Sequence, residues 1–225
     1  MIKAIVTDIE GTTTDIHFVH KVLFPYSRER MAEYVTANEY NPMIVPSLNE
    51  VRQQLTPTAT LEDVIQQLLS WIDHDVKMGS LKAIQGHIWQ TGFEQGHFTG
   101  HVYPDAYENL VKWHQAGIAL YIYSSGSVKA QQLLFGHSDF GDLRYLFKGH
   151  FDTEIGGKKE ATSYQNILET IGLTGNEVLF LSDVVAELDA AKANHINTYL
   201  LNRDHQIIEQ NTHPECDSFS KIQVL

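Results

Sequence analysis

Short apolar runs rich in β-branched and aromatic residues recur along the chain, and each of them ends at polar residues. The runs lie at residues 2–6, 119–123, 178–181 and 198–201. Runs of this length bounded by polar residues are typical of buried strands. Helical patterns separate or flank the later runs, at residues 106–116, 128–135, 160–171 and 186–193. The alternation predicts an α/β fold, a doubly wound parallel sheet with helices on both faces, whose ligands bind beyond the carboxyl ends of the strands.

The segment from residue 17 to residue 100 interrupts this alternation, because it carries helical periodicity without convincing buried strands. Its clearest pattern runs from Thr60 to Met78, and Thr60 with Asp63 resembles a capping box at the start of a helix. Apolar residues repeat at helical spacing along it: Leu61, Val64, Ile65, Leu68, Leu69, Ile72 and Val76. A second helical pattern contains Leu81, Ile84, Ile88 and Trp89.

The length of 225 residues is sufficient for a core domain that carries a smaller insertion. We therefore expect an α/β catalytic core of residues 1–16 and 101–225 and a helical cap of residues 17–100. Glycines at positions 92, 96 and 100 predict a flexible return from the cap to the core.

Composition narrows the class of protein. The hydrophobic fraction of 43% is ordinary for a globular chain, and the single cysteine, Cys216, excludes an internal disulfide framework. The net charge of −12 argues against nucleic-acid binding, which depends on neutralising phosphates. No apolar stretch approaches the roughly 20 residues of a membrane span. We expect a cytoplasmic monomer that acts on a small molecule without binding nucleic acid or membrane.

Two carboxylates follow the first apolar run, at Asp8 and Glu10, and a glycine and three threonines come after them. An aspartate in this position suits nucleophilic attack on phosphorus. Residues two apart on an extended chain point the same way, so both carboxylates can face one site. Such a pair taken alone is more often a solvated turn, and the interpretation therefore depends on motifs elsewhere in the chain.

The string of residues 8–13, D-I-E-G-T-T, resembles the first motif of the haloacid dehalogenase superfamily, D-x-D-x-T, with Glu10 in place of the second aspartate. This replacement resembles one branch of the superfamily, the enolase-phosphatases of methionine salvage. Three more segments match the remaining family motifs in the same order, at Ser124, Lys158 and Asp183.

The resemblance implies a phosphatase that works through an aspartyl phosphate. Asp8 would be the nucleophile, and Glu10 would protonate the leaving oxygen and then activate water. One Mg²⁺ per chain would be bound by Asp8, the Glu10 backbone carbonyl and Asp183, because magnesium prefers oxygen ligands. We hypothesise that the longer Glu10 side chain also helps to move a carbon-bound proton of the substrate.

The second and third motifs would bind the phosphate group. The hydroxyl of Ser124 would donate to a phosphate oxygen, and amides at Ser125 and Gly126, opening the next helix, would add donors. The alternative for this segment, residues 121–127, is a serine N-cap with a glycine turn. Lys158 would neutralise charge at the site, whereas its neighbour Lys159 would be solvated.

The fourth motif departs from the family pattern G-D-x-x-x-D at two positions, where Ser182 replaces glycine and Glu187 replaces the second aspartate. Two roles are open for Glu187: it acts on the metal through water, or it stabilises the first helical turn through the dipole. Paired histidines, His97 with His101 and His17 with His20, do not have the spacing context of a zinc site.

The resemblance implies conversion of 2,3-diketo-5-methylthiopentyl-1-phosphate to 1,2-dihydroxy-3-keto-5-methylthiopentene and phosphate, in methionine salvage. A generic small-metabolite phosphatase of the same superfamily is the alternative within enzymes. A non-catalytic phosphate-sensing module is the alternative from another class, and it would be about half this long and lack a large insertion.

Overall fold

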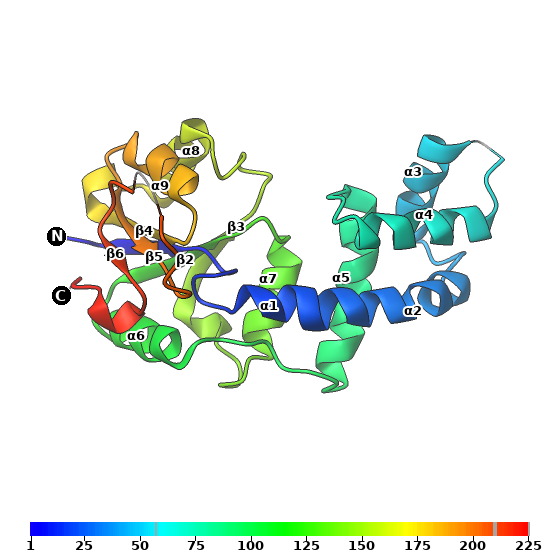
Figure 1. Ribbon diagram of the computed structural model, residues 1–225, viewed down its shortest axis with the longest axis horizontal. Coiled ribbons are helices and arrows are strands. Elements are labelled where there is room, and N and C mark those ends of the chain that lie inside the picture. The colour runs from blue at the N-terminus through cyan, green and yellow to red at the C-terminus, as the bar shows by residue number, and fades with distance from the viewer. Residues whose placement is uncertain (57, 209–210, 225) are drawn as a thin grey trace. The chain divides into compact units, whose positions relative to one another are not determined.

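The computed structural model describes residues 1–56, 58–208 and 211–224. Within them one parallel sheet has the strand order β3-β2-β1-β4-β5-β6 (Figure 1). The strands are β1 Ala4–Thr7, β2 Ala119–Tyr123, β3 Phe147–Phe151, β4 Val178–Ser182, β5 Asn197–Leu201 and β6 Glu215–Cys216. The predicted α/β fold with a parallel sheet is confirmed, and the four apolar runs correspond to β1, β2, β4 and β5.

The strand order reverses at β1, which lies in the middle of the sheet. Thr7, the last residue of β1, pairs with Ile122 of β2 on one side and with Leu181 of β4 on the other. Residues that follow these three strands therefore meet at one edge of the sheet. In open α/β sheets a crevice forms at this edge where the order reverses, and ligands bind there.

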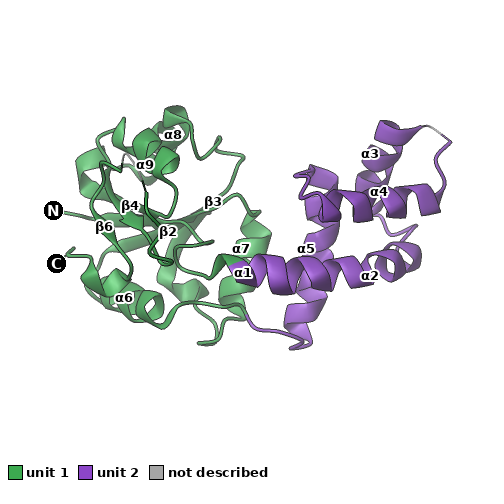
Figure 2. Cartoon of the chain, viewed as in Figure 1, with its two compact units in different colours: residues 1–16, 100–225 green, residues 17–99 purple. Residues whose placement is uncertain are grey.

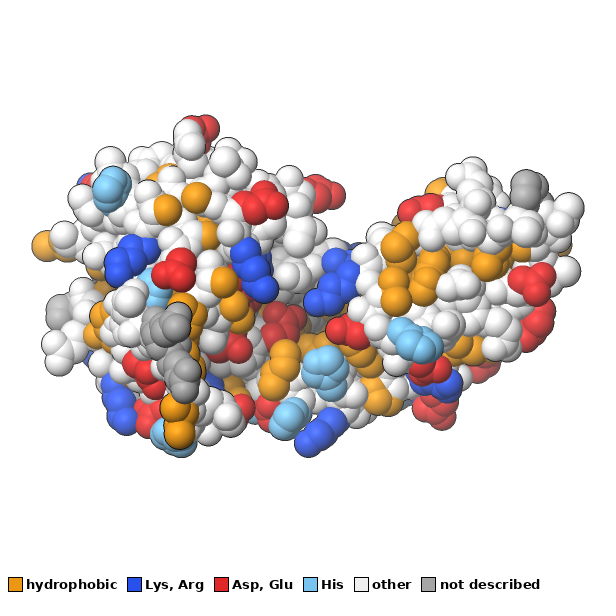
Figure 3. All heavy atoms as spheres, turned by 45° about the horizontal axis from the view of Figure 1, so that its top comes forward, with side chains coloured by type: hydrophobic (Ala, Val, Ile, Leu, Met, Phe, Trp, Pro, Cys, Tyr) orange, Lys and Arg blue, Asp and Glu red, His pale blue; other side chains and the backbone are white. Residues whose placement is uncertain are grey.

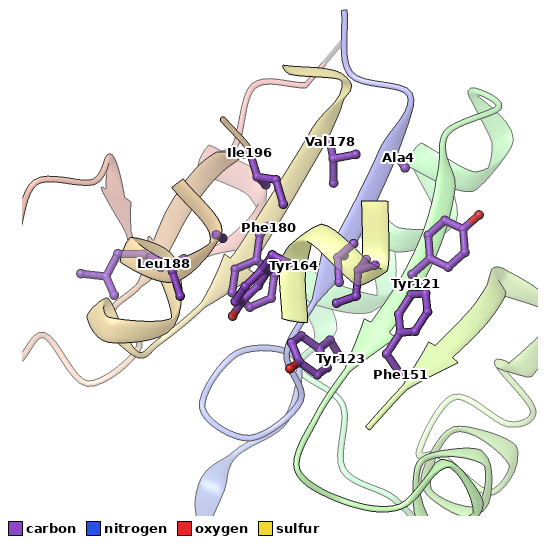
Figure 4. Close-up of a cluster of buried hydrophobic side chains, with 14 residues drawn as sticks. Ala4, Tyr121, Tyr123, Phe151, Tyr164, Val178, Phe180, Leu188 and Ile196 are labelled. Atoms are coloured by element: carbon purple, nitrogen blue, oxygen red, sulfur yellow. The ribbon is translucent and has the colours of Figure 1, made fainter. Parts of the chain in front are cut away.

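Helices pack on both faces of the sheet (Figure 1). They are α6 Pro104–Gln115, α7 Val128–Gly136, α8 Ala161–Ile171 and α9 Val185–Lys192, each within two residues of its predicted start and end. Under α8 and α9 a cluster of buried side chains includes Tyr123, Tyr164, Phe180 and Leu188 (Figure 4). We call its rings, Tyr123, Tyr164 and Phe180, the aromatic layer. Because Tyr123 is the last residue of β2, this layer supports the edge of the sheet that carries the polar residues.

The described chain divides into two compact units, residues 1–16 with 100–225 and residues 17–99 (Figure 2). The second unit is helical and has its own buried core, which includes Met31, Leu48, Leu68 and Ile84. Its elements are α1 Ile16–Phe18, a π-helical turn Val19–Leu23, α2 Phe24–Ala37, α3 Val45–Leu55, α4 Leu61–Asp73 and α5 Gly79–Glu94. The first residue of α1, Ile16, still belongs to the first unit.

The helix α4 carries the capping box that the sequence predicts. The amide of Asp63 donates to the Thr60 hydroxyl at 3.2 Å, and the Thr60 amide donates to the Asp63 carboxylate at 2.8 Å. The predicted end at Met78 is wrong, because α4 stops at Asp73 and the side chain of Val76 is exposed.

The prediction that Gly92 belongs to a flexible return is wrong. Gly92 lies inside α5, and a Cβ atom there would lie 2.6 Å from the ring of Phe98 and 2.9 Å from that of Tyr26. The glycine therefore permits close packing within the helical unit. Gly96, two residues after α5, does adopt the left-handed conformation of a turn, with φ of +68°.

Charged side chains of both signs are interspersed over the visible surface of each unit, without a contiguous basic patch on this face (Figure 3). None of the helices in the described part of the chain is both long enough and apolar enough to cross a bilayer.

Candidate active site

Asp8 directly follows β1, and its amide donates to the Leu181 carbonyl of β4 at 2.9 Å. This bond extends the β1–β4 pairing by one residue, so the carboxylate stands at the point where the strand order reverses. Only 3% of the residue is exposed. The ammonium of Lys158 lies 2.6 Å from Asp8 Oδ1 and offsets the charge of this buried carboxylate.

Lys158 comes from the loop between β3 and α8, and its ammonium contacts two carboxylates. It lies 2.6 Å from Asp8 Oδ1 and 2.7 Å from Glu187 Oε2. Burial by itself would lower the pKa of Lys158, but the Asp8 and Glu187 charges outweigh it and raise that pKa above its ordinary value. The lysine is therefore charged at neutral pH. The side chain of Lys159 is exposed.

Glu10 reaches toward the end of β2. The hydroxyl of Ser124, which is fully buried, donates to Glu10 Oε2 at 3.1 Å. Burial first, and then the charge of Asp8, raise the pKa of Glu10 above its ordinary value. The structure thus brings Glu10 and Ser124 together beside Asp8, and Glu10 holds a proton more readily than an exposed glutamate does.

The loop after β2 contains a serine N-cap, as the alternative interpretation of this segment predicts. The N-cap of α7 is Ser127, whose hydroxyl accepts from the Ala130 amide at 3.3 Å. The prediction that the Gly126 amide opens the helix is wrong, because α7 begins at Val128 and this amide donates to Ser124 Oγ at 3.1 Å. Ser125 is exposed on this loop, and its contact with phosphate stays a prediction.

Asp183 follows β4 and lies against the loop after β1. A Cβ atom at Gly11 would lie 2.3 Å from Asp183 Oδ2, and Gly11 has a φ of +75°, so both space and backbone conformation require glycine there. Burial and then the Asp8 charge raise the pKa of Asp183 to about 7. The negative charges of the two carboxylates thus repel each other.

The two departures in the fourth motif contact each other. The buried hydroxyl of Ser182 donates to Glu187 Oε2 at 2.8 Å and accepts from the Val184 amide at 3.1 Å. The same Glu187 oxygen contacts Lys158. Sequence reasoning considered Glu187 only as a partner of metal or of the helix dipole and missed the lysine. The combined presence of serine for glycine and glutamate for aspartate was the available signal.

The site carries more negative than positive charge. Four carboxylates, those of Asp8, Glu10, Asp183 and Glu187, surround the single ammonium of Lys158, and the raised pKa of Asp183 reflects this imbalance. Hard oxygen donors with surplus negative charge suit a divalent cation such as Mg²⁺. Among the described residues, no group of three or more His, Cys, Asp or Glu side chains is arranged to hold a metal ion by itself. A cation here would therefore need further oxygen donors, such as a backbone carbonyl and waters, besides two of these carboxylates.

The histidines considered for zinc have separate partners. In the helical unit His97 Nδ1 lies 2.8 Å from the Tyr26 hydroxyl. In the α/β unit His101 Nδ1 accepts from the Asp15 amide at 3.0 Å.

Residues 2–195 match the model of the haloacid dehalogenase-like hydrolases, and the chain belongs to this family. It is 50% identical to enolase-phosphatase E1 of Serratia proteamaculans over 223 residues, which cover 99% of this chain and 97% of the relative. It is 53% identical to enolase-phosphatase E1 of Citrobacter koseri over 204 residues, 90% of this chain and 89% of the relative. The resemblance to enolase-phosphatases that Glu10 suggests is confirmed.

Solved structures share the fold of this chain. The crystal structure of the UTR4 protein from Saccharomyces cerevisiae has a TM-score of 0.82 and 33% sequence identity, and the match covers 99% of this chain and 100% of that one. The CbbY protein of Rhodobacter sphaeroides, crystallised with phosphate, has a TM-score of 0.62 at 17% identity over 98% of this chain and 96% of that one. The second likeness concerns the fold alone.

Proposed function

We propose that the protein is an enolase-phosphatase, which converts 2,3-diketo-5-methylthiopentyl-1-phosphate to 1,2-dihydroxy-3-keto-5-methylthiopentene and phosphate in methionine salvage. The observation that carries the proposal is the buried Asp8 at the reversal of strand order, in contact with Lys158 and followed by Glu10. Relatives at about 50% identity bear the name enolase-phosphatase E1, which supports the same substrate class.

Asp8 acts as the nucleophile in this proposal. One of its carboxylate oxygens attacks phosphorus, the bond from phosphorus to the substrate oxygen breaks, and an aspartyl phosphate forms. Lys158, held 2.6 Å from Asp8, offsets the charge that this carboxylate and the phosphoryl group bring together. Ser124 and Ser125 would donate to the phosphoryl oxygens.

Glu10 supplies the proton transfers. Its raised pKa keeps a proton available for the leaving oxygen, and the resulting carboxylate then deprotonates the water that cleaves the aspartyl phosphate. That hydrolysis releases phosphate and restores Asp8. Before dephosphorylation, Glu10 would also help to move the carbon-bound proton whose loss produces the enol, because its side chain is one bond longer than aspartate.

We further propose that Asp8, Asp183 and the Glu10 carbonyl would hold one Mg²⁺. The bound ion would supply charge stabilisation for the phosphoryl oxygens. Asp183 must lose its proton to serve as a ligand, and the surplus of carboxylates around Lys158 fits a cation there. We propose that residues 17–99 form a cap that selects the substrate, and that the enzyme is a cytoplasmic monomer.

The test follows enediol absorbance and free phosphate after addition of the diketone phosphate, with Mg²⁺ or with EDTA. The wild type should form enol and release phosphate in Mg²⁺ and do neither in EDTA. Asp8→Asn should abolish phosphate release, whereas the control Asp75→Asn should not, because Asp75 is exposed and its left-handed backbone, with φ of 50°, tolerates asparagine.

The other results would contradict parts of the proposal. Phosphate release without enol formation would leave the generic phosphatase. Substantial turnover by Asp8→Asn would exclude the aspartyl phosphate. Glu10→Gln should slow enolisation, and an unchanged enolisation rate would remove Glu10 from that step.

A further inference from the structure

The loop that carries Lys158 is fixed by side-chain hydroxyls at three consecutive backbone carbonyls. The three hydrogen bonds run from Tyr123 to the Gly156 carbonyl at 2.9 Å, from Ser163 to the Gly157 carbonyl at 2.8 Å, and from Tyr164 to the Lys158 carbonyl at 2.7 Å. We call Tyr123, Ser163 and Tyr164 the hydroxyl ladder. Each of these residues has 0% or 1% exposure, so the loop is held from its buried side.

The ladder residues come from two rigid elements. Tyr123 ends β2, while Ser163 and Tyr164 lie in the first turn of α8. The Tyr123 and Tyr164 rings meet edge to face with centroids 5.6 Å apart, and Tyr164 packs on Phe180 at 5.1 Å (Figure 4). Burial is the largest cause that raises the pKa of each tyrosine, so both hydroxyls keep the proton that they donate.

The loop has little freedom to move away from the ladder. Gly156 has a φ of +133°, and a Cβ atom there would lie 2.2 Å from the Ser163 hydroxyl. Next to it, the Asn166 side chain donates to the Ile155 carbonyl at 3.1 Å. A displaced loop would leave the Lys158 carbonyl, whose hydrogen bond from Tyr164 is buried, without its donor, which is unfavourable.

The position of the Lys158 backbone matters because the Lys158 side chain reaches two carboxylates of the site. Lysine is flexible, and its ammonium must stay within hydrogen-bonding distance of Asp8 and Glu187 at once. We propose that Tyr123, Ser163 and Tyr164 are positioning residues, which hold the Lys158 backbone so that its ammonium stays on the Asp8 carboxylate. This inference deepens the proposed function and rests on it for the effect on turnover.

Phenylalanine variants test the two tyrosines, because they remove the hydroxyl and keep the ring. For Tyr164→Phe and Tyr123→Phe we expect a decrease in kcat of about tenfold, since displacing a catalytic group by a fraction of an ångström is costly. KM should change by less than about twofold, as expected when transition-state stabilisation is lost. The matched control is Tyr121→Phe: Tyr121 is two residues earlier on β2, buried and stacked on Phe151, and donates to none of the three carbonyls.

A second measurement reports on Lys158 without turnover. An amine-selective acylating reagent is applied to the folded protein, and mass spectrometry gives the ratio of Lys158 to Lys159 modification in one peptide. The exposed Lys159 is an internal reference. The ratio should be low in the wild type and in Tyr121→Phe, and it should rise severalfold in Tyr164→Phe and Tyr123→Phe.

The outcomes separate the two proposals. If the wild type fails to release phosphate from the diketone, the proposed function is wrong, and the labelling ratio still decides on the ladder. An unchanged ratio in the phenylalanine variants would overturn the positioning role, even if kcat fell. If near-ultraviolet circular dichroism shows that Tyr164→Phe is unfolded, Ser163→Ala replaces it, because it removes a ladder hydroxyl without altering the aromatic layer. Its ratio should rise too, and an unchanged ratio would overturn the inference.

Discussion

The hydroxyl of Ser182 donates a 2.8 Å hydrogen bond to Glu187 Oε2, the oxygen that also contacts the ammonium of Lys158. The two positions at which the chain departs from the family's fourth motif are therefore one structural feature. A glycine at position 182 could not make this bond. The glutamate, held by the serine, thus gives the lysine a second carboxylate partner besides Asp8.

We predict that Ser182→Ala lowers the free energy of unfolding by about 1–3 kcal/mol, because hydrogen bonds to charged groups contribute in this range and the site is buried. Urea denaturation measures the change. The control is a double-mutant cycle: in a Glu187→Gln background the same substitution should have a smaller effect. Equal effects in both backgrounds would show that the serine acts independently of Glu187.

Replacing Gly11 should damage the site more than the fold. Gly11→Ala places a Cβ atom 2.3 Å from Asp183 Oδ2, so the carboxylate must move, and phosphate release should fall by about 100-fold. The control is Gly117→Ala, which has a similar φ of +84° but has open space around the added atom. Both variants should lose about 1–2 kcal/mol of stability through left-handed strain. Comparable activity in the two variants would contradict the proposed importance of the Asp183 position.

Arg203 joins three parts of the α/β unit. It donates to both oxygens of Asp105 at 2.8 and 2.9 Å and to the Thr12 carbonyl at 2.8 and 3.1 Å, with 9% of its side chain exposed. Arg203→Met should lower the unfolding free energy by about 3 kcal/mol, because it leaves the partly buried Asp105 carboxylate without its opposite charge.

The control for Arg203 is Arg144→Met. Arg144 also forms a bidentate pair, with Asp142, but both side chains are exposed. Its loss should leave the midpoint of urea denaturation almost unchanged, because exposed ion pairs contribute little. Equal shifts of the urea midpoint in the two variants would show that burial does not decide how much these ion pairs stabilise the fold.

Glu177 should make the free energy of unfolding depend on pH in the acid range. Hydrogen bonds from Lys3 and from the Thr174 amide and hydroxyl lower the pKa of Glu177 to about 2, below its ordinary 4.5. A lowered pKa stabilises the fold above pH 4.5, and this contribution is lost as the pH falls toward 2. Unfolding curves of the wild type and Glu177→Gln should therefore differ most above pH 4.5 and converge toward pH 2. A difference that does not vary with pH would exclude this linkage.

The sequence predicted elements well where one local signal decided them. The Thr60 capping box and a regular apolar stripe marked the start of α4, and unbroken apolar runs marked β1, β2, β4 and β5. The strand β3 was missed because Lys148, Gly149 and His150 interrupt it, and Phe147 and Phe151 alone are buried. The helices α2 and α3 were not predicted individually, because few of their apolar residues are buried and the helical stripe is weak. Prolines in their first turns were start signals that could have been used.

The candidate site was predictable as a set of strand-end residues but not as a network. Parallel strands bring their ends together, so Asp8, Ser124 and Asp183 could be expected at one edge. The contact between Lys158 and Glu187, and the hydroxyl of Tyr123 on the lysine loop, join segments about 30 residues apart in sequence. Local sequence patterns contain no information on these distances, which depend on how α8 and α9 pack on the sheet.

The chain leaves the α/β unit after residue 16 and re-enters it at Gly100, and these two crossings are tied together inside that unit. The Thr14 hydroxyl donates to the His101 carbonyl at 2.8 Å, the Asp15 amide donates to the His101 ring, and the Tyr103 amide donates to the Thr13 carbonyl. Insertions are tolerated where their ends lie close together. Evolution can therefore lengthen, shorten or exchange the helical insert while the sheet and the polar side chains at its edge stay as they are.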